Sequence, residues 1–380
     1  MASSLLAFVA GEASGDLLAA PVIAELMTRL PHARFAGIAG DRMLAAGCEA
    51  WHHVRELSVR GYVEVIADLP RLLHLRSSLR VRMLDEEPAV FVGVDAPDFN
   101  LRLEMQLRAA GIRTVQYVSP SIWAWRSGRI EKIRRAADRV LLVFPFEEMI
   151  YKDAGIAANY VGHPLAATIP MRPDPMAART RLGLADGPCI AVLPGSRRAE
   201  VAHIGPTFVA AIELMAMREP RLSFVLPVAD PPLHAHIDAL LAARPAALAC
   251  TRVIDGDSHT CLEAADAVLV ASGTATLEAA LYKKPMVISY KMPLLSAWIM
   301  RSLGEVPYVG LPNILAGEFV VPELLQDAAT PDALARAMFE QMNDDQNRRA
   351  LVARFAQMHE SLRRDTPALA ADAIMATMPR

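Results

Sequence analysis

The sequence predicts an α/β protein of two doubly wound Rossmann-like domains that face each other across a cleft, with additional helices at the C-terminus. Three observations lead to this prediction. Strand-like and helix-like segments alternate along most of the chain, and a proline-rich break divides them into two series. The length of 380 residues also exceeds what one hydrophobic core usually supports.

The composition indicates a large hydrophobic core. Hydrophobic residues make up 53% of the chain and the formal net charge is −3, so we expect no nucleic-acid partner. A short apolar segment at residues 5–10 has no basic residue before it, which predicts a cytoplasmic protein without a secretion signal. The cysteines lack C-x-x-C spacing, so we expect reduced core thiols at Cys48, Cys189, Cys250 and Cys261.

The first series begins directly after the N-terminus. Short apolar runs predict strands at residues 5–10, 34–38, 89–94, 114–118 and 139–144. Helical periodicity, with breakers such as Pro31 and Gly111, predicts helices at residues 14–30, 41–47, 101–110, 129–137 and 146–154. A longer amphipathic stretch covers residues 63–84.

Prolines interrupt the alternation between residues 162 and 175, where neither a helix nor a central strand can continue. We therefore assign residues 1–163 to an N-terminal domain, 164–175 to a linker, and 176–380 to a C-terminal domain with terminal helices. Strands of the second series are expected at residues 189–193, 222–228, 252–254, 267–271 and 286–289. Domains of this type bind ligands at the carboxyl ends of their strands.

Residues 266–278 predict a buried strand, a glycine turn and the start of a helix. Ser272, Gly273 and Thr274 lie where the helix begins, so its unpaired N–H groups and positive dipole end can receive a phosphate. Glu278 follows about one helical turn after Thr274 and can accept hydrogen bonds from ribose hydroxyls. The alternative is an ordinary N-cap followed by a helical glutamate.

A second turn of this kind is Leu193-Pro-Gly-Ser-Arg197. Gly195 and Ser196 offer N–H and hydroxyl donors, and the planar guanidinium of Arg197 can pair with a diphosphate. A solvated surface arginine is the alternative. Two anion-type turns in one half favour the binding of a diphosphate.

The first half opens with Gly11-Glu-Ala-Ser-Gly-Asp16, which matches neither the dinucleotide fingerprint nor a P-loop. Gly11 and Gly15 permit close approach of a ligand to the backbone. Either Ser14 or Asp16 can cap the next helix, whereas Glu12 is not explained as a cap. A plain strand-to-helix turn is the alternative.

The strand at residues 89–94 leads into Asp95-Ala-Pro-Asp98-Phe-Asn100. Its carboxylates lie at a carboxyl strand end, where one can act as a general base if its pKa is raised. Asp98 is explained as the N-cap of a helix from Leu101, with Asn100 as its competitor. Asp95 is therefore the catalytic candidate.

Other motifs have two interpretations each. Trp123 and Trp125 either contact a sugar or acyl chain or complete a core edge. Asp255-Gly-Asp257 resembles a metal-binding D-x-D, but a turn at Gly256 and an N-cap at Ser258 explain it without a metal. The apolar, arginine-flanked residues 63–84 fit either an anionic bilayer or packing on the sheet, and the same choice applies to residues 292–303.

Six segments in succession resemble blocks of the bacterial lipid-A-disaccharide synthase family. They are Val9-Ala-Gly-Glu-Ala-Ser-Gly-Asp16, Gly93-Val-Asp-Ala-Pro-Asp-Phe-Asn100, Tyr117-Val-Ser-Pro-Ser-Ile-Trp-Ala-Trp-Arg126, Leu193-Pro-Gly-Ser-Arg197, Ala271-Ser-Gly-Thr-Ala-Thr-Leu-Glu278 and Leu311-Pro-Asn-Ile-Leu-Ala-Gly317. The resemblance covers nearly the whole chain in the right order.

This resemblance implies a GT-B glycosyltransferase that needs no metal and no cofactor. Its reaction would join UDP-2,3-diacylglucosamine to 2,3-diacylglucosamine 1-phosphate (lipid X) with inversion, on the inner face of the inner membrane. In that reaction, Asp95 would be the base, with Glu12 and Asp16 as the alternatives. The acceptor side would comprise Gly11, Glu12, Ser14, Asp16, Asp98 and Asn100. UDP would bind to Gly195, Ser196, Arg197, Ser272, Gly273, Thr274, Glu278 and Asn313.

Two other classes remain open at this point. A UDP-sugar epimerase shares the architecture and would also bind UDP through the second half. A non-catalytic two-lobed binding protein normally requires export. A lipid substrate favours membrane contact for residues 62–84 and an anionic membrane surface as a partner. Whether the protein forms a homodimer is left open.

Overall fold

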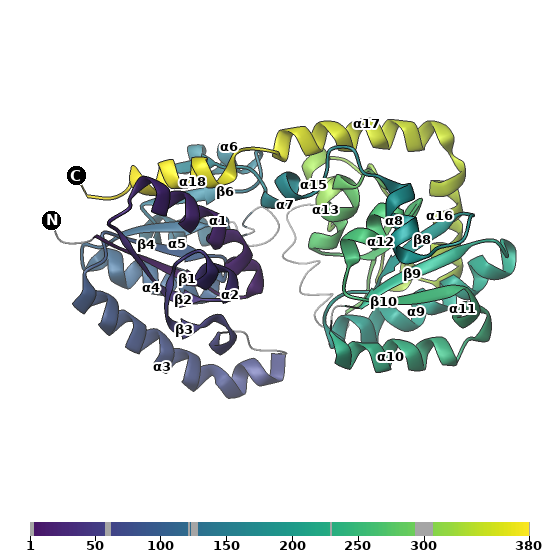
Figure 1. The fold of residues 1–380 in the computed structure, drawn as a ribbon, viewed down its shortest axis with the longest axis horizontal. Helices are drawn as coiled ribbons and strands as arrows, with labels where there is room; N and C mark the ends of the chain where they lie inside the picture. Colours follow the sequence, from purple (N-terminus) through teal and green to yellow (C-terminus); the bar gives the residue numbers. More distant parts are fainter. Residues whose placement is uncertain are drawn as a thin grey trace. The chain divides into compact units, whose positions relative to one another are not determined.

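The computed structural model describes residues 4–57, 62–120, 122, 128–228, 230–292 and 307–379, with side chains of 62–68 and 231 left aside. It divides into unit 1, Met1–Ala167 with Ser361–Arg380, and unit 2, Thr168–Glu360. Each unit contains a parallel sheet with helices on its faces (Figure 1). The predicted α/β class with two doubly wound domains is confirmed, and a cleft between them stays a prediction.

Unit 1 has a seven-stranded sheet of order β3-β2-β1-β4-β5-β6-β7, parallel throughout. Its strands are β1 Leu5–Ala10, β2 Arg34–Ala39, β3 Glu49–His53, β4 Val90–Val94, β5 Arg113–Tyr117, β6 Arg139–Leu142 and β7 Ala158–Tyr160. Its helices are α1 Ala13–Arg29, α2 Asp41–Ala45, η1 Val54–Glu56, α3 Tyr62–Glu86, α4 Pro97–Ala109, α5 Arg129–Ala136, α6 Glu147–Asp153 and α18 Thr366–Met375.

Unit 2 has a six-stranded parallel sheet of order β10-β9-β8-β11-β12-β13. Its strands are β8 Cys189–Leu193, β9 Ser223–Val228, β10 Thr251–Asp255, β11 Ala267–Ala271, β12 Met286–Tyr290 and β13 Glu323–Leu325. Its helices are α8 Pro175–Leu182, α9 Arg198–Arg218, α10 Pro231–Ala242, α11 Pro245–Cys250, α12 Ser258–Ala264, α13 Thr274–Leu281, α15 Leu311–Ala316, η2 Gln326–Ala328 and α16 Pro331–Asn343. The helices α7 Pro164–Thr168 and α17 Asp345–Leu362 cross the unit boundaries.

Both sheets reverse their strand order at one place. In unit 1 this occurs between β1 and β4, where Ala10 is paired with Val94. In unit 2 it occurs between β8 and β11, where Leu193 is paired with Val270. Ligands of doubly wound sheets bind at such reversal points, beyond the carboxyl ends of the strands. The loops that follow these four strands therefore hold the positions expected for ligand binding.

Several helices begin where the sequence combines a capping side chain with a proline in the first turn. The side chains of Asp174, Thr330 and Asp365 accept hydrogen bonds from the N–H groups of Ala177, Ala333 and Ala368, at 3.0, 3.2 and 3.3 Å. Proline is the first residue of α8 and α16 and the second residue of α18, and it lacks the N–H that would be unpaired there. These local signals fix the starts of α8, α16 and α18.

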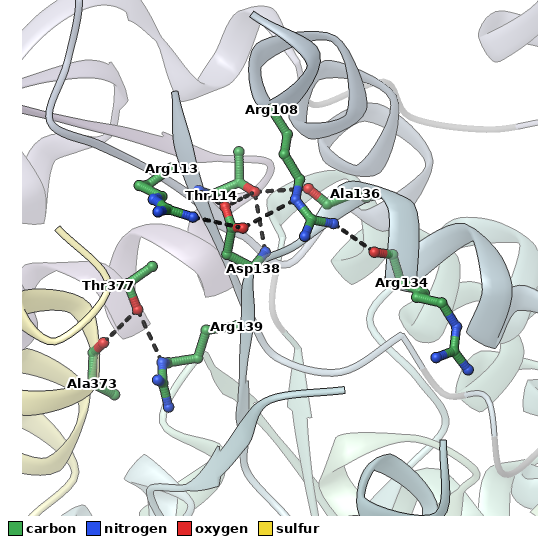
Figure 2. A network of polar contacts seen from close by, with 9 residues as sticks. All are labelled: Arg108, Arg113, Thr114, Arg134, Ala136, Asp138, Arg139, Ala373 and Thr377. Carbon is green, nitrogen blue, oxygen red and sulfur yellow. Dashed lines mark hydrogen bonds and ion pairs between the residues drawn. The ribbon is translucent and has the colours of Figure 1, made fainter. Parts of the chain in front are cut away.

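The segment Ser361–Arg380 belongs to unit 1, whereas the sequence prediction placed all terminal helices in the C-terminal domain. Arg139 Nε donates to Thr377 Oγ1 at 2.9 Å, and Thr377 Oγ1 donates to the carbonyl of Ala373 at 2.8 Å (Figure 2). The N–H of His163 donates to the carbonyl of Leu362 at 2.9 Å. The helix α18 also packs on α1. These long-range contacts explain why the chain returns to unit 1.

The interior of each unit is apolar, as the composition predicts. The helix α9 is the single described helix long and apolar enough to cross a membrane, and 56% of its apolar window is buried inside the protein. Burial of that kind is typical of a core helix. Of the four cysteines, which are all free thiols, Cys48, Cys189 and Cys261 are buried and Cys250 is partly exposed.

Candidate active site

The loop after β4 has an unusual backbone. Asp95 has a φ angle of 56° and Ala96 one of 42°, both in the left-handed region that non-glycine residues rarely adopt. The Asn100 side-chain amide donates to the carbonyl of Asp95 at 2.9 Å, and Gln116 Nε2 donates to the same oxygen at 3.3 Å. The N–H of Asp95 donates to the carbonyl of Tyr117 at 2.9 Å. These bonds hold Asp95 in its strained conformation.

The carboxyl group of Asp95 lies beside the loop that follows β1. Burial raises the pKa of Asp95 above its usual value, and the negative charge of Glu12 raises it further. Hydrogen bonds from the Ala96 N–H and the Ser14 hydroxyl favour the charged form and oppose the shift. The structure thus brings the candidate base together with two of the predicted acceptor-side residues, Glu12 and Ser14. A carboxylate with a raised pKa is suited to general-base catalysis.

Gly11 is required for close packing of two loops, and its predicted approach to a ligand stays a prediction. A Cβ atom on Gly11 would lie 2.1 Å from the Cβ of Ala96, so this glycine allows the two loops to touch. A Cβ on Gly15 would lie 3.2 Å from the carbonyl oxygen of Val94. Both glycines therefore serve contact between the β1 and β4 loops.

Asp16 is also occupied within the protein. Its carboxylate is buried and accepts hydrogen bonds from the N–H groups of Gly40, Arg42 and Met43 at 2.9, 3.0 and 3.0 Å. These groups lie at the start of α2, so Asp16 satisfies that helix end in place of a ligand. The prediction that Asp16 or Ser14 caps α1 was wrong, because Glu12 occupies the N-cap position without a side-chain bond.

The helix α4 begins earlier than predicted, at Pro97 and not at Leu101. Ala96 is its N-cap, so neither Asp98 nor Asn100 caps it. Asp98 is exposed and forms an ion pair with Arg129 at 3.0 Å. Asn100 is fully buried and binds the backbone carbonyls of Val9, Val94 and Asp95. Asn100 therefore positions the loop from inside the protein.

The helix α4 also carries a buried carboxyl group, that of Glu104. Glu104 is completely buried, and neither of its oxygens has a hydrogen-bond partner within the described part of the chain. Burial raises the pKa of Glu104 to about 8, so its neutral form predominates at neutral pH. A Cβ on Gly93 would lie 2.4 Å from Glu104 Oε1 and 2.9 Å from the Cβ of Asn100. Gly93 thus leaves room for these two side chains.

In unit 2, the turn after β8 is closed by a glutamate. The N–H groups of Ser196 and Arg197 donate to Glu200 Oε2 at 3.2 and 3.3 Å, at the start of α9. A Cβ on Gly195 would lie 2.6 Å from the same oxygen. Glu200 therefore takes the backbone donors that were expected to receive a phosphate. The exposed guanidinium of Arg197, 3.5 Å from Glu200 Oε1, and the exposed Ser196 side chain face solvent.

The turn after β11 leaves donors open at the start of α13. Gly273 has a φ angle of 139° and precedes Thr274, the first residue of the helix. In the described residues, no acceptor is found for the N–H groups of Thr274 and Ala275. The Ser272 hydroxyl, by contrast, donates to the carbonyl of Val309 at 3.1 Å. The predicted anion site thus consists of the exposed Gly273 and Thr274, with Ser272 as their support.

Glu278 lies one turn along α13 and has a partner that the sequence interpretation missed. His259 Nε2, on α12, lies 3.7 Å from Glu278 Oε1, and the carboxylate raises the pKa of His259. The His259 ring contacts the edge of Tyr282, with 5.8 Å between ring centroids. His259 directly follows Ser258, the predicted start of a helix. This position was the one signal in the sequence that could have indicated its role.

Asn313 has hydrogen-bond partners inside the protein, and its predicted contact with UDP stays a prediction. It is fully buried, its oxygen accepts from the N–H groups of Val320 and Val321 at 2.8 and 3.0 Å, and its amide donates to Glu323 Oε1 at 2.8 Å. The carboxylate of Glu323 in turn accepts from the N–H groups of Val309 and Gly310, both at 2.9 Å. Because Val309 binds Ser272, Asn313 supports the anion site from behind.

The D-x-D segment has a structural explanation. Asp257, not Ser258 as predicted, is the N-cap of α12 and accepts from the Thr260 N–H at 3.3 Å. Within the described ranges, no group of three or more His, Cys, Asp or Glu side chains is placed to hold a metal ion. The predictions for Trp123, Trp125 and residues 293–303 fall outside the described residues.

Comparison with known proteins assigns this arrangement to a family. Residues 6–374 match the family model described as lipid-A-disaccharide synthetase. The chain belongs to the lipid-A-disaccharide synthase family. A lipid-A-disaccharide synthase of Burkholderia vietnamiensis (strain G4 / LMG 22486) is 56% identical over 372 residues, which is 97% of this chain and 95% of the relative. The resemblance found in the sequence blocks is therefore confirmed.

Solved structures agree on the fold of this synthase family member. MurG of Acinetobacter baumannii has a TM-score of 0.61 at 17% identity and covers 98% of this chain and 99% of its own. A UDP-GlcNAc 2-epimerase of Neisseria meningitidis bound to UDP-GlcNAc has a TM-score of 0.63 at 12% identity, covering 98% and 100%. Such low identities show the GT-B type of fold alone. The family match favours the synthase over the epimerase.

Proposed function

We propose that the chain condenses UDP-2,3-diacylglucosamine with lipid X to lipid A disaccharide 1-phosphate and UDP. The observation that carries this proposal is the family match over residues 6–374. In the proposed step, the acceptor 6-hydroxyl oxygen bonds to the donor anomeric carbon while the bond from that carbon to the UDP oxygen breaks. UDP leaves with the bonding electrons, and the anomeric configuration inverts.

Asp95 is the proposed base that takes the hydroxyl proton. Its raised pKa supports this role, because a base whose pKa is nearer to the working pH accepts a proton more readily. Ser14 orients the carboxylate by its hydrogen bond, and Asn100 fixes the backbone beneath it at 2.9 Å. The negative charge of Glu12 raises the pKa of Asp95 further.

The negative charge of the departing UDP needs stabilisation in the second unit. Arg197 and the start of α13 at Gly273 and Thr274 are the proposed partners of the diphosphate, and Glu278 is the proposed partner of the ribose. Support comes from the exposed guanidinium and from the backbone donors left open at Thr274 and Ala275. Asn313 acts indirectly, because it holds Glu323 and through it Val309.

The test is a turnover assay with radiolabelled donor. We expect UDP and disaccharide to form only when lipid X is present, whereas an epimerase would convert the donor alone. Asp95→Asn should lower kcat about 100-fold or more and leave donor binding nearly unchanged. Turnover of this variant near the wild-type level would contradict the assignment of the base.

We further propose that the protein is peripheral on the inner face of the inner membrane and that α3 contacts lipid. One face of α3 packs in the core through Leu75, Leu79 and Met83, as the packing interpretation predicts. Leu69 and Val81 on the same helix are 49% and 63% exposed. Anionic liposomes should recruit the protein better than neutral ones. Equal recruitment by both kinds of liposome would contradict a contribution of the α3 arginines to membrane binding.

A further inference from the structure

A groove of about 340 Å³ is present in unit 1. Three helices contribute to it, and its lining residues are Leu69, Leu73, Arg76, Asp98, Arg102 and Lys132. Asp98 belongs to the first turn of α4, three residues after Asp95. The groove therefore begins next to the loop that holds the candidate base.

One part of the groove is apolar. Leu69 and Leu73 are 49% and 40% exposed, and they lie four residues apart on α3, so they share one face of this helix. Leu75 and Leu79 of the same helix are buried in the core. The exposed pair is therefore not needed for packing, and its position in a groove is typical of an apolar binding surface.

The other part of the groove is cationic. The pKa of Arg76 is lowered mainly by burial and further by the positive charge of Arg102. Arg76 and Arg102 therefore lie close together. In the described part of the chain, no ion pair joins either arginine to a carboxylate, and Asp98 binds Arg129 instead at 3.0 Å. Lys132 adds a third positive charge. Like charges held together in this way are stabilised by a bound anion.

We propose that this groove binds the acceptor substrate, with its 1-phosphate on Arg76, Arg102 and Lys132 and an acyl chain along Leu69 and Leu73. The proposal rests on the proposed function. An acceptor of this type combines an apolar chain with a phosphate monoester, and the groove offers both complementary surfaces. A monoester carries about two negative charges at neutral pH, so it suits a cluster of cations better than a membrane phosphodiester, which carries one.

The geometry of α4 agrees with this placement. Arg102 follows Pro97 by five residues, which corresponds to about 7.5 Å along the helix axis. The 6-hydroxyl and the 1-phosphate are at opposite ends of the acceptor sugar. A sugar whose hydroxyl lies at Asp95 can therefore extend its phosphate toward Arg102.

The test compares two acceptors in neutral detergent micelles, one with the 1-phosphate and one without it. We expect Arg102→Ala to raise the KM for the phosphorylated acceptor about 10- to 100-fold and to change the KM for the other acceptor and for the donor little. Arg76→Gln should act in the same way. Arg135→Ala is the matched control, because this arginine is exposed on α5 and does not line the groove.

Other outcomes would overturn the proposal. Two results for Arg102→Ala would show that the cations contact membrane lipid and not the acceptor phosphate. One is an equal loss of turnover with both acceptors, and the other is weaker binding of the protein to anionic vesicles as the only effect. If the wild-type protein turns over neither acceptor, the proposed function itself is wrong. This result can be distinguished from a wrong assignment of the groove, in which the wild-type protein is active. Circular dichroism of each variant distinguishes loss of binding from loss of folding.

Discussion

The side-chain amide of Asn100 donates a hydrogen bond to the backbone carbonyl of Asp95 over 2.9 Å. This bond joins a fully buried residue of α4 to the candidate catalytic base, and it stabilises a backbone with a φ angle of 56°. The same amide reaches the carbonyls of Val9 and Val94, so one side chain fastens the ends of β1 and β4. The position of Asp95 therefore depends on a residue that is itself fully buried.

Removal of this amide should lower kcat without weakening the binding of the sugar donor. Asn100→Asp keeps the shape of the side chain but replaces a hydrogen-bond donor by an acceptor, next to carbonyl oxygens. We expect a loss of about 1 to 3 kcal/mol in the free energy of unfolding and a lower kcat. Denaturant unfolding and steady-state kinetics measure both. A donor KM that rises as strongly as kcat falls would contradict this role.

The two neighbours of the Asp95 carboxyl should shift the pH dependence of kcat/KM in opposite directions. Asp95 must be deprotonated to act as a base, so activity falls as the pH drops through its raised pKa. Glu12→Gln removes a negative charge that raises this pKa, and the acid limb should move to lower pH. Ser14→Ala removes a bond that lowers the pKa, and the limb should move to higher pH. Identical acid limbs in both variants would show that another group titrates.

Adjacent arginines at the start of α9 provide a test of the diphosphate site. Arg197→Ala should raise the donor KM and weaken UDP binding about 10- to 100-fold, since a charge-assisted contact is lost. Arg198→Ala, the neighbouring exposed residue, is the control and should change UDP affinity little. Calorimetric titration with UDP measures both variants. Unchanged affinity in Arg197→Ala would exclude a phosphate contact at this residue.

Glu104 should make the protein less stable as the pH rises. Its folded-state pKa of about 8 exceeds the ordinary value of 4.5, so the unfolded chain releases this proton first. Between these values, the group lowers the free energy of unfolding by up to about 1.4 kcal/mol per pH unit. Glu104→Gln removes this dependence, and its stability relative to wild type should increase with pH. Parallel pH profiles for the two proteins would contradict a buried neutral carboxyl.

The central strands and the loops that follow them could be predicted from the sequence, because fully buried parallel strands are continuous apolar runs. The strands at β1, β4, β8 and β11 are buried along their whole length. The strands β3, β7 and β13 were missed. They lie at the edges of the sheets, and their partly exposed residues show no comparable apolar run.

By itself, the sequence determined the fold class, the order of the buried strands along the chain, the family, and the nearness of Asp95 and Glu12 to one sheet edge. These follow from local patterns and from the rule that places ligands at the carboxyl ends of parallel strands. Only the tertiary structure decided which polar groups already have partners. Asp16 binds the N–H groups at the start of α2, which lie 24 to 27 residues further along the chain. Asn313 and Glu200 bind groups within ten residues, but only the folded loops show that these groups are paired. The same long-range packing returned α18 to unit 1 and gathered the cations of the groove, which no local pattern could indicate.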